Sequence, residues 1–162
     1  MSSLNFNYDL GSLMTSLTFW KHLTKQANSA FEREHYPLAE TLYRQSIELM
    51  KIALAEKPEK RKTEDPAMMQ IICLSVSIQN LADLYARQGR WQRCFTTLES
   101  YLSLYERAAA DTLRPPHVSL TFMQEGCRFR RELLRHRASC KCPHSIDTHT
   151  SAAVSPMPEL VH

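Results

Sequence analysis

The stretch QNLADLYARQGRWQRCFTTLESYL, residues 79–102, restricts the fold of this chain more than any other segment. A small residue, Ala82, precedes an aromatic one, Tyr85, and a glycine at position 89 precedes a second aromatic, Trp91. Small residues recur where two antiparallel helices cross closely, and large side chains fill the space between them. Gly89 suits the left-handed residue that ends a helix. The stretch therefore predicts two antiparallel helices joined by a short turn.

Residues 24–47, TKQANSAFEREHYPLAETLYRQSI, repeat this arrangement when Tyr36 is placed over Trp91. In this alignment small residues match small residues, and large residues match large residues. The matched pairs are Ala27 with Ala82, Ala39 with Cys94, Tyr43 with Leu98 and Ile47 with Leu102. The chain is therefore expected to contain two helix–turn–helix units that pack in the same way.

Apolar residues recur at spacings of three and four over five segments, which is the period of an amphipathic helix. Runs rich in Ala, Leu, Glu, Arg and Gln also favour helix. The predicted helices span about residues 16–33, 37–55, 66–88, 90–110 and 116–137. The charged run 56–65 reads as a solvated loop, and Asp65-Pro66 is a start signal for the third helix. The sequence thus predicts an all-α fold of five helices.

The two units resemble the tetratricopeptide repeat, whose pattern is W-x₂-L-G-x₂-Y…A-x₃-F…P. The residues that carry the resemblance are Ile78-x₂-Leu81-Ala82-x₂-Tyr85 and Cys94-x₃-Leu98 in the second unit, and Leu23-x₂-Gln26-Ala27 and Ala39-x₃-Tyr43 in the first. The chain is similar to the long-helix variant found in kinesin light chains and many bacterial proteins, over about residues 17–137. The resemblance implies an α-solenoid of two antiparallel repeats plus a C-terminal capping helix.

The spacing of the units departs from the standard repeat. The offset from Tyr36 to Trp91 is 55 residues, against a period of about 34. About seven of the extra residues lengthen the second helix, which is close to two full turns and keeps its apolar face aligned. An ordinary helical bundle with accidental matches to the pattern is the alternative. In either case the aromatic residues on these faces are expected to be core residues.

The ends of the chain differ in composition from its middle. Residues 1–15 are expected to form a flexible N-terminal segment, 16–137 the helical domain, and 138–162, rich in Ser, Thr, Pro and His, a disordered tail. The N-terminus does not read as a secretory signal, and the most apolar window, AMMQIICLSVSIQNLA, is too short to span a bilayer. Five cysteines, an odd number, fit free thiols better than a disulfide framework. A cytoplasmic protein without a membrane partner is predicted.

The sequence carries none of the catalytic motifs with a recognisable spacing. It has no Gly-rich phosphate loop, no G-x-S-x-G elbow and no H-E-x-x-H, and 3 glycines are too few for a nucleotide cradle. The net charge of +3 does not by itself imply a nucleic-acid or membrane partner. The prediction is a protein that is not an enzyme and uses no cofactor.

The resemblance implies a binding surface, because tetratricopeptide units bind through the concave face made by the first helix of each unit. The residues that it places there are Lys21, Thr24, Lys25, Asn28, Phe31, Glu32, Val76, Gln79, Asn80, Asp83 and Arg87. Asn28 and Asn80 match two asparagines of the family members that clamp a carboxylate, although Thr24 stands where those members have lysine. Both asparagines are also common in the plain consensus, where they hold neighbouring backbone.

The function implied is that of a scaffold or adaptor, which binds a peptide or a partner helix in this groove. The third helical unit lacks its second helix, as a terminal capping helix does. Edge faces of so short a stack leave Leu and Met residues exposed, which favours self-association.

A second candidate surface is the basic segment CRFRRELLRHRASCK, residues 127–141. Arg128, Arg131 and Arg135 share one face at helical spacing, and such a face can contact nucleic-acid phosphates or an acidic protein. The simpler reading is a solvated last helix whose basic end complements the helix macrodipole. A nucleic-acid-binding protein that acts through this helix is the alternative to the scaffold.

A third candidate is a metal site in the segment HRASCKCPH. Its ligands would be His136, Cys140, Cys142 and His144, four donors of the type that zinc takes. The Cys-x-Cys spacing fits one tetrahedral site poorly, since Cys-x₂-Cys is the usual spacing. Accessory thiols in a tail are the simpler interpretation, and no metal is expected.

Overall fold

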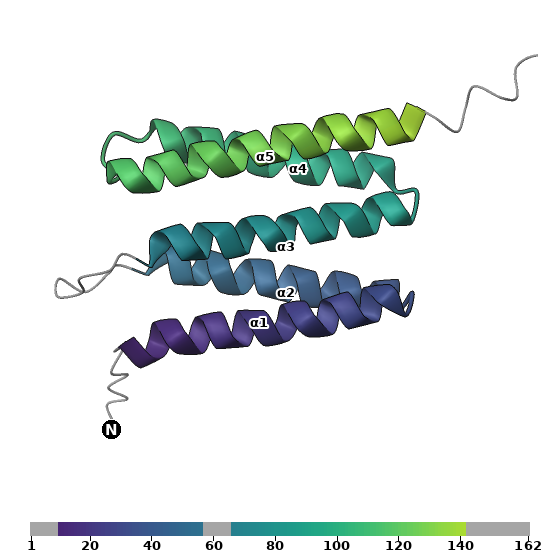
Figure 1. Cartoon of the computed structure of the whole chain (residues 1–162), viewed down its shortest axis with the longest axis horizontal. Helices are drawn as coiled ribbons and strands as arrows, with labels where there is room; N and C mark the ends of the chain where they lie inside the picture. The colour runs from purple at the N-terminus through teal and green to yellow at the C-terminus, as the bar shows by residue number, and fades with distance from the viewer. Residues whose placement is uncertain (1–9, 57–65, 142–162) are drawn as a thin grey trace, which may run out of the picture.

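The computed structural model describes residues 10–56 and 66–141, and side chains from residue 16 onward within these ranges. These residues form five α-helices and no strand (Figure 1). The helices are α1 (Leu10–Glu32), α2 (Tyr36–Ala55), α3 (Ala67–Arg87), α4 (Trp91–Ala110) and α5 (Pro116–Lys141). The prediction of an all-α fold with five helices is confirmed.

The first and last helices are longer than predicted. Helix α1 begins at Leu10 instead of residue 16, and α5 continues past residue 137 to Lys141. Once a helix exists, each added residue gains a backbone hydrogen bond at little further cost, so apolar periodicity understates its length. Of the loop predicted at 56–65, Glu56 follows the end of α2, and residues 57–65, including Asp65, lie outside the described residues. The remainder of the two predicted flexible ends also lies outside them.

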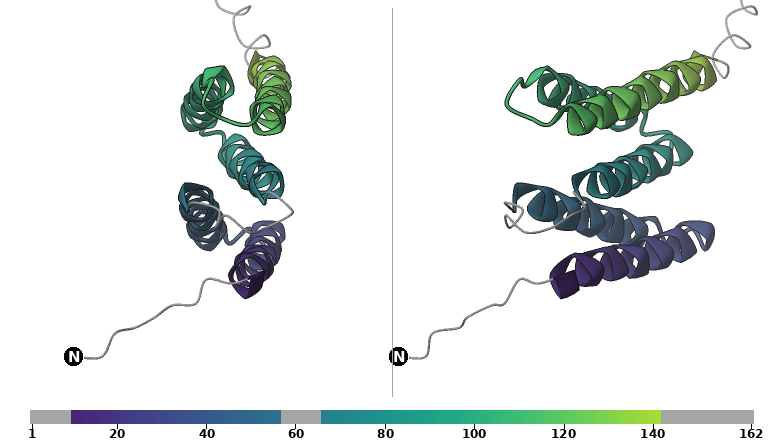
Figure 2. Two further views of the ribbon diagram at one scale, coloured as in Figure 1. Left: turned by 90° about the vertical axis from the view of Figure 1, so that its left-hand side faces the viewer. Right: turned by 60° about the vertical axis from the view of Figure 1, so that its left-hand side comes forward.

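The helices are arranged in two layers. Seen end-on, α1, α3 and α5 lie on one side, and α2 and α4 lie on the other (Figure 2, left). Each helix packs against its neighbours along the chain, and α3 contacts all four of the others. By length and composition alone, α3 could cross a membrane. Its most apolar window was expected from the sequence to be too short to span a bilayer. The place of α3 at the centre of the described helices accounts for its apolar character.

The turns that join α1 to α2 and α3 to α4 have the same backbone. Glu34 and Gly89 are left-handed, with φ of 61° and 68°. The next residues, His35 and Arg90, have φ/ψ of −80°/61° and −83°/58°. In both turns the amide of the residue after the left-handed one donates to a carbonyl five residues back, at 2.8 Å, which is the Schellman arrangement. The predicted role of Gly89 is confirmed, and Glu34 takes the same role in the first turn.

The aligned positions of the two units are buried alike. Ala27, Ala39, Ala82 and Cys94 have no exposed surface, so the helices of each pair approach closely at these small residues. The larger aligned residues Tyr43, Leu98 and Ile47 are also buried, and Leu102 is half-buried. The predicted pattern of small and large core positions is confirmed.

Two polar connections cross the core. The indole Nε1 of Trp20 on α1 donates to the Ser77 hydroxyl on α3 at 2.9 Å, and the hydroxyls of Ser77 and Ser46 on α2 are 2.8 Å apart. The hydroxyls of Ser75 on α3 and Tyr105 on α4 lie 3.0 Å apart. These bonds fix α3 relative to both layers, because a buried hydroxyl is costly without its partner.

Candidate binding surfaces

Most of the predicted groove residues of α1 lie around one hollow on the outside of the helix. The hollow has a volume of about 510 Å³. Its lining consists of Trp20, Lys21, Thr24, Lys25, Asn28, Ser29 and Glu32. Five of the six residues predicted on α1 are among them. The exception, Phe31, packs edge-on against Tyr36 at the turn, with 6.0 Å between the ring centroids. Phe31 is therefore a packing residue of the turn.

Asn28 has a structural partner of its own. The Tyr43 hydroxyl on α2 donates to Asn28 Oδ1 at 2.7 Å. Burial of this phenol, together with the nearby carboxylates of Asp83 and Glu32, raises the pKa of Tyr43 to about 12, so it stays protonated and donates. The side chain of Asn28 thus secures α1 to α2 through a tyrosine hydroxyl and not through neighbouring backbone, and its part in binding a carboxylate stays a prediction.

The predicted residues of α3 do not reach the α1 hollow. Asp83 instead faces α5, where its Oδ1 is 2.7 Å from Arg135 Nη2 and 3.0 Å from His136 Nε2. Val76, Gln79 and Asn80 are half-buried, and Arg87 is exposed. Among the described residues, Asn80 and Arg87 have no hydrogen-bond or ion-pair partner. The structure thus places the two predicted sets in one layer, but at separate positions.

Three buried side-chain atoms in the described part of the chain have no hydrogen-bond partner. They are Thr24 Oγ1 on α1, Gln79 Nε2 on α3 and Glu125 Oε2 on α5. All three helices belong to the same layer (Figure 2). Buried polar atoms are nearly always paired, so unpaired ones call for an explanation such as a role in binding.

The predicted basic face of α5 is largely neutralised. Arg128 Nε lies 3.4 Å from Glu125 Oε1, and Arg135 Nη2 lies 2.7 Å from Asp83 and 2.5 Å from Glu132. Two neighbouring arginines also have acidic partners on α4, in the pairs Arg130–Glu106 and Arg137–Glu99. Arg131 alone of the predicted three has no partner within the described ranges. Two of the three predicted arginines thus have acidic partners, Glu125 and Glu132 on α5 itself and Asp83 on α3, and a nucleic-acid contact through this face stays a prediction.

His136 belongs to a different cluster from the predicted cysteine and histidine set. It is buried, and its Nε2 lies 3.0 Å from Asp83 Oδ1 and 3.9 Å from Glu132 Oε2. These three groups are close enough to share one metal ion. The Arg135 guanidinium already bonds both carboxylates and supplies the positive charge there. Cys140 is half-buried and unpaired, and Cys142 and His144 lie outside the described residues.

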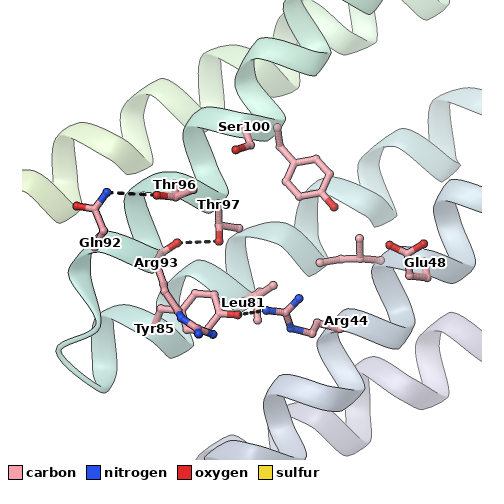
Figure 3. Close-up of a pocket in the computed structure, with 11 residues that line it drawn as sticks. Arg44, Glu48, Leu81, Tyr85, Gln92, Arg93, Thr96, Thr97 and Ser100 are labelled. Atoms are coloured by element: carbon pink, nitrogen blue, oxygen red, sulfur yellow. Dashed lines mark hydrogen bonds between the residues drawn. The ribbon is translucent and has the colours of Figure 1, made fainter.

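A larger cavity lies on the opposite layer, between α2 and α4, with α3 as its floor (Figure 3). Its volume is about 680 Å³. The residues around it are Arg44, Ile47, Glu48, Leu81, Tyr85, Gln92, Arg93, Thr96, Thr97, Ser100 and Tyr101. We call it the α2–α4 groove. None of its residues is among those predicted from sequence to bind a partner.

One carboxylate at the end of this groove accepts hydrogen bonds from three residues and lies close to a third guanidinium group. Glu40 Oε1 accepts from Arg44 Nη2 at 3.2 Å and from the Tyr85 hydroxyl at 2.9 Å. Glu40 Oε2 accepts from Arg90 Nη1 at 3.1 Å, and Arg93 Nη1 lies 3.6 Å from Oε1. Three guanidinium groups thus surround a single negative charge.

The Glu40 carboxylate is ionised in this setting. Burial raises its pKa, but the hydrogen bonds from Tyr85 and Arg90, the charge of Arg90 and the bond from Arg44 outweigh burial, so the pKa lies below its ordinary value of 4.5. Burial and the hydrogen bond to Glu40 raise the pKa of Tyr85, which therefore remains a donor. Only the Glu40–Arg44 spacing of four residues is visible in the sequence, since Tyr85, Arg90 and Arg93 come from another unit.

Comparison with known proteins gives a family for the chain. No curated protein matches it, and no solved structure matches it. A family model described as "Protein of unknown function (DUF2753)" matches residues 18–153, which include nearly all of the helical part. The chain therefore belongs to the DUF2753 family.

Proposed function

We propose that this protein is a non-enzymatic adaptor that binds a segment of a partner protein along the layer formed by α1, α3 and α5. Its architecture in this proposal is a short tetratricopeptide-like array, with α1–α2 and α3–α4 as units and α5 as the cap. The matching dihedral angles at Glu34–His35 and Gly89–Arg90 support the repeat, since two unrelated hairpins need not share one turn. The four described cysteines are free, which fits the cytoplasmic location that we propose with it.

The observation that carries the proposal is the hollow on α1. Five of the eleven residues expected to meet a partner line it, and Lys21 and Lys25 are exposed at its rim. Trp20 is the one aromatic residue in its lining, and its Nε1 is already satisfied by Ser77. An aromatic wall with exposed charges and amides around it suits a protein segment, which offers both apolar side chains and backbone groups.

The same layer continues this surface. On α3, the side chains of Asn80, half-buried, and Arg87, exposed, have no hydrogen-bond or ion-pair partner within the described chain. Nucleic acid is supported less well, because Arg128 and Arg135 are engaged by acids. Each phosphate contact would have to compete with an existing ion pair.

A comparative pull-down from the source cytosol tests the proposal. The intact protein is compared with a Lys21→Glu, Lys25→Glu, Arg87→Glu variant, with nuclease present. Asn28 is left intact, because its loss would strip the Tyr43 hydroxyl of its partner. A matched control reverses three other exposed charges, Lys51→Glu on α2, Arg107→Glu on α4 and Arg114→Glu in the turn after α4, none of which lines the α1 hollow.

The proposal expects a protein that the intact chain and the control capture and that the α1–α3 variant loses. Equal capture by all three proteins would contradict it. If nucleic acid co-purifies when nuclease is omitted, and no protein is captured, the proposal is wrong and α5 is the binding site.

A further inference from the structure

We infer that the α2–α4 groove is a second binding site, which takes an acidic segment of a partner protein and holds its carboxylates at Arg44 and Arg93. The site is independent of the surface proposed above, because it lies on the opposite layer. It is assigned from the charges, exposures and distances around Glu40.

The arginine end of the groove has more positive charge than its own acid can balance. Arg44, Arg90 and Arg93 all reach Glu40, and within the described residues no other carboxylate pairs with any of the three. Partly desolvated arginines with unused donors attract carboxylates, with which they form short, charge-assisted bonds. An incoming acidic side chain would therefore complete the cluster.

Two of the three guanidinium groups are available to a ligand. The side chains of Arg44 and Arg93 are each 57% exposed, whereas Glu40 is 20% exposed and Arg90 is 34% exposed. Arg93 is 3.6 Å from Glu40, beyond hydrogen-bond distance, so it can meet a new carboxylate without losing a bond. Arg90 and Glu40 form the fixed base of the site, and Arg44 and Arg93 form its open side.

Tyr85 keeps these groups in place before any ligand arrives. The guanidinium carbons of Arg90 and Arg93 lie 4.8 Å and 5.9 Å from the centroid of its ring. Its hydroxyl accepts from Arg44 Nη2 at 2.7 Å and donates to Glu40. In Figure 3 the Arg44 side chain points to the Tyr85 hydroxyl, and the end of the Arg93 side chain overlaps the Tyr85 ring. Positions fixed in advance lower the entropy cost of binding.

The rest of the groove is suited to a peptide backbone. Thr96, Ser100 and Gln92 on α4 present hydroxyl and amide groups along one wall (Figure 3). Arg93 also lies in the first turn of α4, where the positive end of the helix dipole favours an anion.

The charges along the groove determine where a ligand can have negative groups. Glu48 lies away from the arginine end, on the α2 side of the groove (Figure 3). A nucleic acid would place phosphates along the whole groove and meet Glu48, whereas a protein segment can concentrate its acids at one end. An acidic protein segment is therefore the ligand class that fits.

The test is selection from a displayed library of random dodecapeptides on the full chain. Three variants are selected in parallel: Arg44→Gln with Arg93→Gln, a double control Arg107→Gln with Arg114→Gln, and Lys21→Glu with Lys25→Glu on the α1 hollow. The control removes the same charge from exposed arginines outside the groove. Selected peptides are then synthesised and their dissociation constants measured by fluorescence anisotropy, with circular dichroism to show that each variant is folded.

The intact chain, the control and the α1 variant are expected to enrich peptides rich in Asp and Glu. The Arg44→Gln, Arg93→Gln variant is expected to lose that enrichment and to bind the synthesised peptides at least about tenfold more weakly. The inference is overturned if no acidic enrichment occurs, or if the control weakens binding as much as the groove variant. If only the Lys21→Glu, Lys25→Glu variant loses the enrichment of acidic peptides, these peptides bind at the α1 hollow and not in the α2–α4 groove. That result would also overturn the inference.

Discussion

At the scale of single residues, the most informative position is Glu34. It occupies the left-handed conformation that Gly89 occupies in the second turn, with φ of 61°. A residue with a Cβ is strained in that region by about 1–2 kcal/mol, although glycine also gives more freedom to the unfolded chain. We expect Glu34→Gly to stabilise the protein by about 0.5–1 kcal/mol, measured as the free energy of unfolding in urea.

The second turn provides the matched reverse change. A Cβ at Gly89 would meet no atom within 4 Å, so Gly89→Ala tests the backbone strain alone. It is expected to destabilise the protein by about 1 kcal/mol. If Glu34→Gly and Gly89→Ala change the free energy of unfolding in the same direction, the two turns are not equivalent.

Glu40 predicts a dependence of stability on pH. Because the pKa of Glu40 is lowered on folding, its ionised form stabilises the folded protein above the ordinary pKa of 4.5, and that contribution is lost as the pH falls through the folded pKa. Glu40→Gln is expected to cost about 1–2 kcal/mol at pH 7 and clearly less at pH 3.5. The measurement is chemical denaturation at both pH values.

Glu48→Gln is the control for this prediction, since its side chain is 60% exposed and, among the residues that the structure describes, pairs only with Lys51 on its own helix. Such an exposed pair contributes little at either pH. A cost of Glu40→Gln that is the same at pH 7 and pH 3.5 would show that Glu40 is not held ionised by Tyr85 and the arginines.

At the scale of helices, the connection of α1 to α3 depends on a few contacts. Helix α1 packs mainly on α2, and the Trp20–Ser77 bond of 2.9 Å is a polar contact between its described side chains and α3. Ser77→Ala is expected to lower the free energy of unfolding by about 1–2 kcal/mol and to speed hydrogen exchange at the Trp20 indole N–H, because that donor loses its acceptor. Ser103→Ala, at an exposed position of α4, should change neither quantity. Unchanged indole exchange in Ser77→Ala would argue against the bond.

The positions of the helices were predictable from sequence, because apolar residues such as Leu23, Ala27 and Ala30 recur with the helical period and are buried. The turn at Gly89 was also predictable, because glycine is the usual left-handed residue at the end of a helix. Glu34 did not, because glutamate has no preference for the left-handed region and its conformation follows from the packing of the two helices it joins.

The candidate sites were predictable only where they lie on a single helix. Lys21, Lys25 and Asn28 gather around one hollow because their spacing puts them on one face of α1. Contacts between helices were not predictable in the same way: Asp83 meets Arg135 across 52 residues, and Glu40 meets Arg90 across 50. Such pairs depend on how two helices are rotated relative to each other, which periodicity does not specify.

At the scale of the whole molecule, the two layers give the protein two faces of different chemistry. The α1–α3–α5 layer has the hollow and the unpartnered polar atoms, and the α2–α4 side has the arginine cluster and its groove. The ends of the array also expose apolar side chains, among them Leu38 on α2 and Met123 on α5, at 52% and 58%. Self-association through these ends remains a prediction, consistent with exposed apolar patches marking contacts.

Site-specific photo-crosslinking in the source cytosol shows whether a protein binds at the α1 hollow. A crosslinking amino acid is placed at position 25 on the α1 hollow and, as a control, at position 107 on α4, which is outside both proposed sites. We expect position 25 to form a discrete adduct with another protein, identifiable by mass spectrometry, and position 107 to form none. Adducts of equal yield at both positions, or an adduct at position 25 that consists of nucleic acid, would contradict this expectation.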